Sequence, residues 1–298
     1  MTLSTRALAD LLLLALFWGA SFLAIRTALD EIGPLTTVAL RVAPAAALLW
    51  AWAGLRGHAL PPRAAWSALA VMGLLNNAIP FTLMAWGQLF IPTGLTAILN
   101  VTTAIWGALV AALVFSDERL SPARAAAILL GFAGVVLAVG PEALAGAGSD
   151  LWASGAVLLG TFSYALAGAW ARATLAQVPP VVAAAGMLTG ASLIMVPLAL
   201  AAEGVPPVPS GSTVLAILYY AGVATGIAYL LYFRILAQAG SANLLLVTLL
   251  IPPVAIVLGA LVRGEALPPS AFAGLAALAV ALLILRVRPP RRVRPKGV

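Results

Sequence analysis

Ten apolar segments, each roughly 20 residues long and separated by short loops, restrict the possible folds of this chain more than any other feature. A helix needs about 20 mostly apolar residues to cross the hydrocarbon core of a bilayer, so each segment predicts one membrane-spanning helix. The segments are too long for barrel strands and lack the alternation of apolar and polar residues that such strands show. The predicted fold is therefore all-α and integral to the membrane, with ten transmembrane helices. The segments cover approximately residues 9–29, 34–54, 65–88, 92–115, 121–140, 151–173, 180–202, 213–236, 241–262 and 268–286.

The composition agrees with a membrane protein and argues against an enzyme. Hydrophobic residues make up 63% of the chain and charged residues only 8%, whereas an ordinary soluble domain carries about 25% charged residues. There is no cysteine, and the single histidine, His58, lies in a basic loop, so no thiolate or histidine metal site is predicted. No Ser/His/Asp set and no pair of carboxylates occurs inside an apolar segment. We expect neither catalysis nor a cofactor nor a metal ion.

A run of basic residues follows the last apolar segment directly. The formal net charge of the chain is +7, which by itself could suggest nucleic acid as a partner. A basic tail beside a membrane span is instead typical of a cytoplasmic anchor under the positive-inside rule, and it can contact anionic membrane lipid. We therefore predict no binding of nucleic acid. The basic residues of this run are Arg286, Arg288, Arg291, Arg292, Arg294 and Lys296.

The remaining charges predict the orientation of the helices. Placing the N-terminus in the cytoplasm puts the basic loops on the cytoplasmic side together with the tail. Most acidic residues then fall on the opposite side, where Arg263 is the clear basic exception. We expect an inner-membrane protein with both termini in the cytoplasm. The acids of the opposite side are Asp30, Glu31, Glu142, Asp150, Glu203 and Glu265.

The chain also repeats itself. The pattern E-x-L-x-P occurs at 118–122 and at 265–269, an offset of 147 residues, and three further pairs share an offset of 146. Each repeat holds five predicted helices, and because five is odd the second repeat enters the membrane from the opposite side. Two inverted repeats around a central cavity can exchange conformations and so open the cavity to either side in turn, which predicts a transporter working by alternating access. We expect repeats over 1–146 and 147–286 and a basic tail over 287–298. The three further pairs are Arg26 with Arg172, Pro34 with Pro180 and Trp18 with Tyr164.

Three stretches of the chain carry a resemblance to a known family. They read "WGASFLAIRTALDEIGPLTTVALR", "ERLSPARAAAILLGFAGVVLA" and "EALPPSAFAGLAALAVALLIL". With W-G-x-x-F in the first helix, an arginine in the second and E-x-L followed by glycines near the fifth and tenth, the whole chain resembles the EamA-type exporters of the drug/metabolite transporter superfamily. Within that superfamily it looks closest to the aromatic amino-acid exporters. One departure is visible: the ninth segment has Pro252 and Pro253, but the aligned position in the fourth is Trp106.

Polar and aromatic residues inside the apolar segments predict where the cavity lies. Polar residues in a membrane-embedded helix are costly and tend to face the interior of the helix bundle, although small polar residues can also serve only to pack helices together. Asn76, Pro80 and Met84 recur every four residues, and Asn100 is followed by Thr103, so each set lies on one helical face. The aromatic residues can stack on an apolar or aromatic substrate. The candidate substrate-binding residues are Trp18, Asn76, Pro80, Met84, Asn100, Thr103, Tyr164, Trp170, Tyr220, Tyr229 and Asn243.

Arg41 lies inside the second segment, roughly 10 Å beyond its start at Pro34 at a rise of 1.5 Å per residue. A charge at that depth needs a partner. One interpretation is that Arg41 holds a substrate carboxylate. The other is structural: Arg41 bonds to the C-terminal carbonyls of a neighbouring helix, or extends outward to Asp30 or Glu31. The family resemblance favours the structural role, because family members with differing substrates share this arginine.

No acidic residue lies in the middle of a segment, which disfavours a multidrug exporter for lipophilic cations. The predicted substrate is a small neutral or zwitterionic molecule, in keeping with the resemblance to amino-acid exporters. We expect a monomer that exports small metabolites, foremost (aromatic) amino acids, by alternating access. The alternative is a channel or a lipid scramblase or flippase, which would have the same ten-helix hydropathy.

Overall fold

The structure is a computed structural model that describes residues 5–116, 121–140, 148–244 and 247–286, apart from the side chains of residues 239–243 and 286. All regular secondary structure in these residues is helical. The elements are α1 (Thr5–Ala28), α2 (Pro34–Leu55), α3 (Ala65–Gly73), the π-helical η1 (Leu74–Ala78), α4 (Ile79–Gly87), α5 (Thr93–Asn100), α6 (Thr102–Val114), α7 (Pro122–Val139), α9 (Ser149–Thr174), α10 (Pro180–Ala202), α11 (Gly211–Ile217), the π-helical η2 (Leu218–Ile227), α12 (Ala228–Leu244), α13 (Val247–Arg263) and α14 (Pro269–Arg286).

Proline and glycine mark several helix ends. Proline is favoured at the first helical position because the N–H group that it lacks would have no partner there. Glycine is favoured just after a helix because it adopts positive φ at little cost. Helices α2 and α10, which are the second and seventh predicted spans, both begin with proline and are followed by a glycine at positive φ. Helices α2, α7, α10 and α14 begin at Pro34, Pro122, Pro180 and Pro269, and the positive-φ glycines are Gly57, Gly140, Gly204 and Gly264.

The all-helical membrane fold predicted from the sequence is confirmed for the described residues. Eight helical runs are long and apolar enough to cross a membrane: 5–28, 34–55, 65–87, 93–114, 122–139, 149–174, 180–202 and 211–238. Two further apolar helices, Val247–Arg263 and Pro269–Leu285, are shorter. The ninth and tenth predicted spans are therefore also apolar helices within the described residues.

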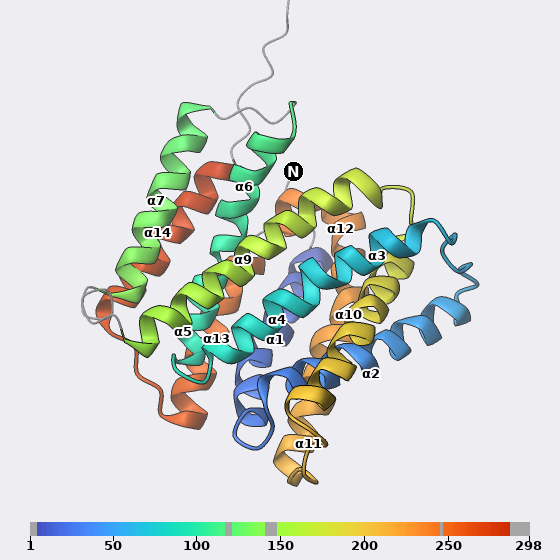
Figure 1. Ribbon diagram of the computed structural model, residues 1–298. Helices are drawn as coiled ribbons and strands as arrows, with labels where there is room; N and C mark the ends of the chain where they lie inside the picture. The colour runs from blue at the N-terminus through green and yellow to red at the C-terminus, as the bar shows by residue number, and fades with distance from the viewer. Residues whose placement is uncertain (1–4, 117–120, 141–147, 245–246, 287–298) are drawn as a thin grey trace, which may run out of the picture.

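The helices of the two halves of the chain pack against one another rather than forming separate bundles. Helix α2 lies along α10 and α7 lies along α14, while α1 packs on α13 and α4 on α9. Each of these pairs joins a helix before residue 140 to one after residue 148. In Figure 1 the α7–α14 pair forms one flank of the molecule and the α2–α10 pair the other, with α1, α4 and α9 between them. The space between the flanks is therefore bounded by both halves.

Glycines allow α7 and α14 to approach each other closely. A Cβ atom added at Gly274 would lie 2.5 Å from the carbonyl oxygen of Gly134 and 2.6 Å from the backbone nitrogen of Ala138. Within a membrane, helix association depends on close packing and on small residues that let backbones approach. No side chain fits at this point of the α7–α14 contact, so it requires glycine.

We expect Gly274→Ala to destabilise the protein, because the two helices must separate to admit the new methyl group. Forcing additional atoms into a close-packed contact costs about 1–3 kcal/mol, which exceeds the gain of about 1 kcal/mol in helix propensity. Gly155→Ala is the matched control, since Gly155 is exposed on α9 and an added Cβ meets nothing within 4 Å. Thermal unfolding in detergent should show a lower melting temperature for Gly274→Ala only. Equal melting temperatures for both variants would contradict the packing.

Candidate functional site

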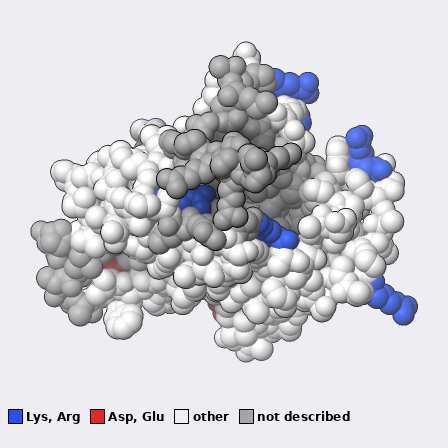
Figure 2. Space-filling view, turned by 90° about the horizontal axis from the view of Figure 1, so that it is seen from above, with Lys and Arg blue, Asp and Glu red and all other residues white. Residues whose placement is uncertain are grey.

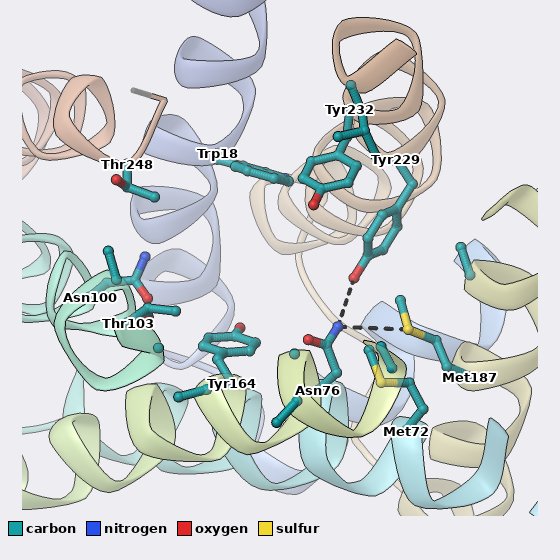
Figure 3. Close-up of a pocket in the computed structure, with 18 of the residues that line it drawn as sticks. Trp18, Met72, Asn76, Asn100, Thr103, Tyr164, Met187, Tyr229, Tyr232 and Thr248 are labelled. Atoms are coloured by element: carbon teal, nitrogen blue, oxygen red, sulfur yellow. Dashed lines mark hydrogen bonds between the residues drawn. The ribbon is translucent and has the colours of Figure 1, made fainter. Parts of the chain in front are cut away.

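A cavity of about 1000 Å³ lies between the two halves of the chain. Pockets for small molecules commonly measure about 300–1,000 Å³, so its size suits a metabolite. Its walls are mostly apolar and aromatic, with a few polar groups. Figure 3 shows how ten of the lining residues surround the space: Trp18, Met72, Asn76, Asn100, Thr103, Tyr164, Met187, Tyr229, Tyr232 and Thr248.

Aromatic rings bound the cavity on two sides. The rings of Trp18 and Tyr232 lie 5.9 Å apart, centre to centre, and bring α1 and α12 together at one end of the view in Figure 3. At the opposite end, Tyr164 meets Phe81 edge-on at 6.4 Å. Rings arranged in this way offer both faces and edges to a ligand that carries an apolar or aromatic group.

Asn76 projects into the cavity from the π-helical turn η1. Its amide nitrogen donates a hydrogen bond to the hydroxyl oxygen of Tyr229 at 3.3 Å and lies 3.7 Å from the sulfur of Met187 (Figure 3). These contacts connect the third predicted span to α12 and α10. Single π-helical turns inside α-helices are frequent at functional sites, and here the turn sets the position of a polar side chain in an apolar wall.

Asn100 and Thr103 form a polar patch on the wall across from Asn76 and Tyr229 (Figure 3). They lie on either side of the break between α5 and α6 at Val101. The amide oxygen of Asn100 and the hydroxyl of Thr103 are buried without a hydrogen-bond partner in the described structure. A buried polar group left unpaired costs about 1–3 kcal/mol. A ligand that supplied the missing partner would recover that free energy.

Arg41 is held in the wall of the cavity by two contacts. Its Nε donates to the hydroxyl oxygen of Thr225 at 3.0 Å, and its guanidinium carbon lies 3.8 Å from the centre of the Phe81 ring. Thr225 in turn donates its own hydroxyl proton to the carbonyl oxygen of Tyr220, at 2.7 Å across the π-helical turn of η2. The oxygen of Thr225 is therefore turned toward Arg41 as an acceptor.

The structural partners that we expected for Arg41 are not the ones that the structure gives. Among the described residues, neither helix C-terminal carbonyls nor the acids of the α1–α2 loop bind it. Asp30 accepts hydrogen bonds from Arg26 at 3.1 Å and from Arg263 at 2.8 Å. Glu31 accepts hydrogen bonds from the backbone and side chain of Ser210 instead. The sequence could not reveal Thr225 as the partner, because it lies 184 residues from Arg41.

Most of the predicted substrate-binding residues line this one cavity. They are Trp18, Asn76, Met84, Asn100, Thr103, Tyr164 and Tyr229, together with Arg41. Pro80, Trp170 and Tyr220 do not line it. Asn243 falls among residues 239–243, whose side chains lie outside the described part of the structure.

The positions of the three predicted residues that do not line the cavity have physical explanations. The π-helical turn η1 adds a residue to one turn, so the cavity face continues from Asn76 to Phe81 rather than to Pro80, which packs against Gly160 of α9. The indole N–H of Trp170 donates to the carbonyl oxygen of Ala68 at 3.0 Å and so points toward α3. Tyr220 is fully buried in the apolar core beside α2 and α10.

The sequence prediction missed several lining residues. Phe81 and Thr248 line the cavity, as do two methionines, Met72 and Met187. Met72 lies four residues before Asn76, so the same four-residue spacing could have identified it. Phe81 could not be found in this way, because the π-helical turn breaks the spacing.

The cavity extends toward the basic face of the molecule. Its lining includes Phe115 at the end of α6, Arg124 in the first turn of α7 and Arg172 in the last turns of α9. Figure 2 looks onto this face, where several Arg side chains are spread and little Asp or Glu is in view. The α6 and α9 ends that reach this face are the ends that the charge distribution places in the cytoplasm.

On the opposite, acidic face, three glutamates cap helices of the other half of the chain. Glu203 accepts hydrogen bonds from the backbone nitrogens of Leu35 and Thr36 at 2.9 and 2.8 Å, and Glu265 accepts from the backbone nitrogen and hydroxyl of Thr93 at 2.9 and 2.6 Å. The third, Glu31, binds Ser210 ahead of α11, as described above. Carboxylates stabilise helix N-termini because free N–H groups and the positive end of the helix dipole lie there.

Glycine and an ion-pair cluster complete this face. A Cβ atom at Gly33 would lie 2.3 Å from the carboxyl carbon of Glu203, so only glycine admits the carboxylate to the start of α2. Asp30, held between Arg26 and Arg263, connects the end of α1 to the end of α13. Together these contacts fasten the two halves to each other on the side away from the extension of the cavity.

The cap by Glu31 predicts a dependence of stability on pH. Hydrogen bonds from the side chain and backbone of Ser210 lower the pKa of Glu31 below its usual value of 4.5. A lowered pKa means that stability is fully present above pH 4.5 and is lost as the pH falls through the pKa of the folded state. We expect Glu31→Gln to flatten the melting temperature of the detergent-purified protein between pH 5 and 3 relative to wild type. Identical pH profiles would refute this cap.

Comparison with known proteins agrees with this architecture. The model of the EamA-like transporter family matches residues 6–140 and 151–287. A chloroplastic WAT1-related protein of Arabidopsis thaliana is 28% identical over 90% of this chain, which spans 66% of that protein's length. The uncharacterized inner membrane transporter YedA of Escherichia coli K12 is 25% identical over 91% of this chain and 88% of its own.

Two further comparisons concern an exporter and a solved structure. A protein of Streptantibioticus cattleyicolor named "probable terminal-alkyne amino-acid exporter" is 26% identical over 94% of this chain and 93% of its own. A crystal structure superposes with a TM-score of 0.67 over 94% of this chain and 96% of that chain, at 21% identity, and supports the fold alone. Since the family model matches both halves of the sequence, the chain belongs to the EamA-like transporter family.

Proposed function

We propose that this membrane transporter exports small neutral or zwitterionic metabolites, amino acids foremost, by alternating access through the central cavity. In this proposal ten helices form two inverted repeats over 1–146 and 147–286, in the inner membrane, with both termini in the cytoplasm. The transporter acts as a monomer. Members of the EamA-like transporter family are not enzymes, and the proposal involves no catalytic step.

The observation that carries the proposal is the cavity itself. It lies between the two halves and extends toward the basic face, while capping glutamates and ion pairs join the two halves on the acidic face. Such a cavity at the interface of repeats is where an alternating-access transporter binds its substrate. Amides, hydroxyls and aromatic rings line it, and no Asp or Glu occurs among the described lining residues. The similarity to an amino-acid exporter supports amino acids as the substrate class.

Uptake into proteoliposomes tests this function. We expect saturable uptake of one or more labelled amino acids from a panel, stimulated when the vesicles are preloaded with the same unlabelled amino acid. Stimulation by counter-substrate requires a binding site that faces each side of the membrane in turn and can change sides with substrate bound. A channel has no such site. Unsaturable flux without counter-stimulation would indicate a channel instead, and movement of labelled lipid in place of amino acid would indicate a scramblase.

The proposed topology predicts which sites are accessible from outside. The chain has no cysteine, so single cysteines can be introduced without further changes. Cysteines at Glu31 and Gly148 should react with a membrane-impermeant thiol reagent in intact cells. Cysteines at Gly57 and Lys296 should react only after permeabilisation. The reverse pattern at both pairs would overturn the orientation and with it the direction of export.

A further inference from the structure

We infer that Arg41 binds the carboxylate of the transported molecule, so that the cavity selects organic carboxylates and excludes organic cations. This inference rests on the proposed function and narrows its substrate class. It also resolves the two roles that the sequence left open for Arg41. The structural contacts of Arg41 position its guanidinium. The two terminal guanidinium nitrogens, which these contacts leave unused, recognise the ligand.

The hydrogen-bonding capacity of Arg41 is largely unused. A guanidinium carries five N–H donors in a planar fork. In the described structure Arg41 makes one hydrogen bond, from Nε to Thr225, and a stacking contact with Phe81. The two terminal nitrogens, with four of the five donors, make no hydrogen bond to the described residues. An arginine with only a structural role deep in a membrane would be expected to use these donors, because polar groups there are costly to leave unpaired.

The two contacts that Arg41 does make leave the fork in a fixed orientation. Thr225 is buried, and because its hydroxyl proton goes to the carbonyl of Tyr220, its oxygen is held in place as an acceptor. The Phe81 ring covers one face of the guanidinium. Fixed on one edge and one face, the side chain can present its terminal nitrogens to a carboxylate as two parallel hydrogen bonds, the geometry that arginine favours for this group.

The charge of the cavity favours an anionic group on the ligand. Arg41 lies in its wall, and none of its described lining residues is acidic. A positive charge in a site of low dielectric attracts a carboxylate strongly and repels an ammonium group that has no carboxylate of its own. Phosphate suits this cavity less well, because a dianion needs more donors than the apolar and aromatic walls around Arg41 provide.

Binding to the detergent-purified wild type tests the inference with matched ligands. The probes are phenylalanine, leucine, their amides, 3-phenylpropanoate, phenethylamine and inorganic phosphate, and the readout is the rise in melting temperature with ligand concentration, since a ligand stabilises the state that it binds. We expect the acids and 3-phenylpropanoate to bind about tenfold or more tightly than the amides and the amine, as loss of a charge-assisted hydrogen bond implies. Equal binding of acids and amides, or no binding by any acid, would overturn the inference. Preference for phosphate over every carboxylate would also overturn it.

Binding to variants then tests whether Arg41 causes the preference for acids over amides. Arg41→Ala should reduce the ratio of acid to amide affinity from tenfold or more to about one. Arg41→Lys should retain part of the preference, because lysine keeps the charge but loses the fork. Thr225→Val removes the hydroxyl that positions Arg41. This variant should lower the ratio of acid to amide affinity even though the arginine itself is retained. Arg63→Ala is the control for loss of one positive charge, since Arg63 is exposed in the loop before α3 and does not line the cavity.

An unchanged ratio in Arg41→Lys and Thr225→Val would overturn the assignment even if Arg41→Ala failed to fold. The transport assay distinguishes failure of this inference from failure of the proposed function. Arg41-dependent binding of carboxylates without counter-stimulated uptake would refute the exporter and keep the carboxylate site. Counter-stimulated uptake of amino acids with an unchanged ratio in the variants would refute the site and keep the exporter.

Discussion

Replacing Asn76 with leucine is expected to reduce transport about tenfold or more while the protein still folds and inserts. Leucine has the same number of side-chain heavy atoms with the same branching, so the apolar wall stays filled. The variant loses the amide that contacts Tyr229 and faces the cavity. Loss of one polar partner of a bound zwitterion costs about 1–3 kcal/mol, or roughly 5- to 150-fold in affinity. Asn100→Leu should have a similar effect, because Asn100 lines the opposite wall (Figure 3).

Asn77 provides a control of the same residue type at the neighbouring position. It is fully buried, does not line the cavity, and neither its amide oxygen nor its amide nitrogen has a partner in the described structure. Replacing an unpaired buried amide by an apolar side chain removes a desolvation cost. Asn77→Leu should therefore keep transport and either keep or raise the melting temperature. The measurement is the initial rate of counter-stimulated uptake by all three variants. Near-normal rates in both Asn76→Leu and Asn100→Leu would show that these two residues do not belong to the site.

Replacing Glu265 with alanine is expected to lower the stability of the protein by about 2 kcal/mol or more. The carboxylate accepts hydrogen bonds from both the backbone nitrogen and the hydroxyl of Thr93, and hydrogen bonds to charged groups contribute about 1.5–3 kcal/mol each. Its loss also leaves the N-terminus of α5 without its cap. A cysteine at Gln88, which lines the cavity beyond α4, should then react faster from the acidic side.

Asp150→Ala is the matched control for loss of a carboxylate. Asp150 is exposed and accepts a hydrogen bond of 3.2 Å from the hydroxyl of the neighbouring Ser149. Its removal should change the melting temperature little, since exposed interactions of this kind contribute little. Thermal unfolding in detergent compares the two variants. Equal melting temperatures would show that the Glu265 cap does not hold the two halves together.

The membrane fold could be predicted from the sequence because length and apolarity are local properties. Each span can be recognised from its own residues, and proline and glycine mark ends such as those of α2 and α10. Glu118, the counterpart of Glu265 in the repeated E-x-L-x-P pattern, lies outside the described residues.

Part of the cavity wall was predictable from helical spacing and from polarity. Asn76 and Met84 were found from helical spacing, and Asn100 and Thr103 from polarity inside an apolar segment. Spacing failed at Pro80, because the π-helical turn η1 shifts the cavity face by one residue to Phe81. A π-helical turn has no recognisable pattern in this sequence, so a regular four-residue spacing places the cavity face at Pro80.

Contacts between distant parts of the chain were beyond prediction. The partner of Arg41 lies 184 residues away, and the glutamates that cap α2 and α5 lie 168 and 172 residues from the backbone that they bind. Polarity alone could not separate Tyr220, which is buried in the core, from Tyr229, which lines the cavity nine residues later. Only the packing of the two halves decides which of these side chains meets a ligand.

Accessibility of a single cysteine at Gly107 tests alternating access through this cavity most directly. Gly107 lines the cavity, and an added Cβ meets nothing within 4 Å, so the substitution should be tolerated in a chain without other cysteines. In membrane vesicles, a membrane-impermeant thiol reagent should modify Gly107→Cys from the cytoplasmic side, and a transported amino acid should protect it. From the outer side, modification should be slow until that amino acid is supplied and the carrier turns over. Equal modification from both sides without substrate would mean an open pore, and modification from the outer side alone would place the opening on the wrong face.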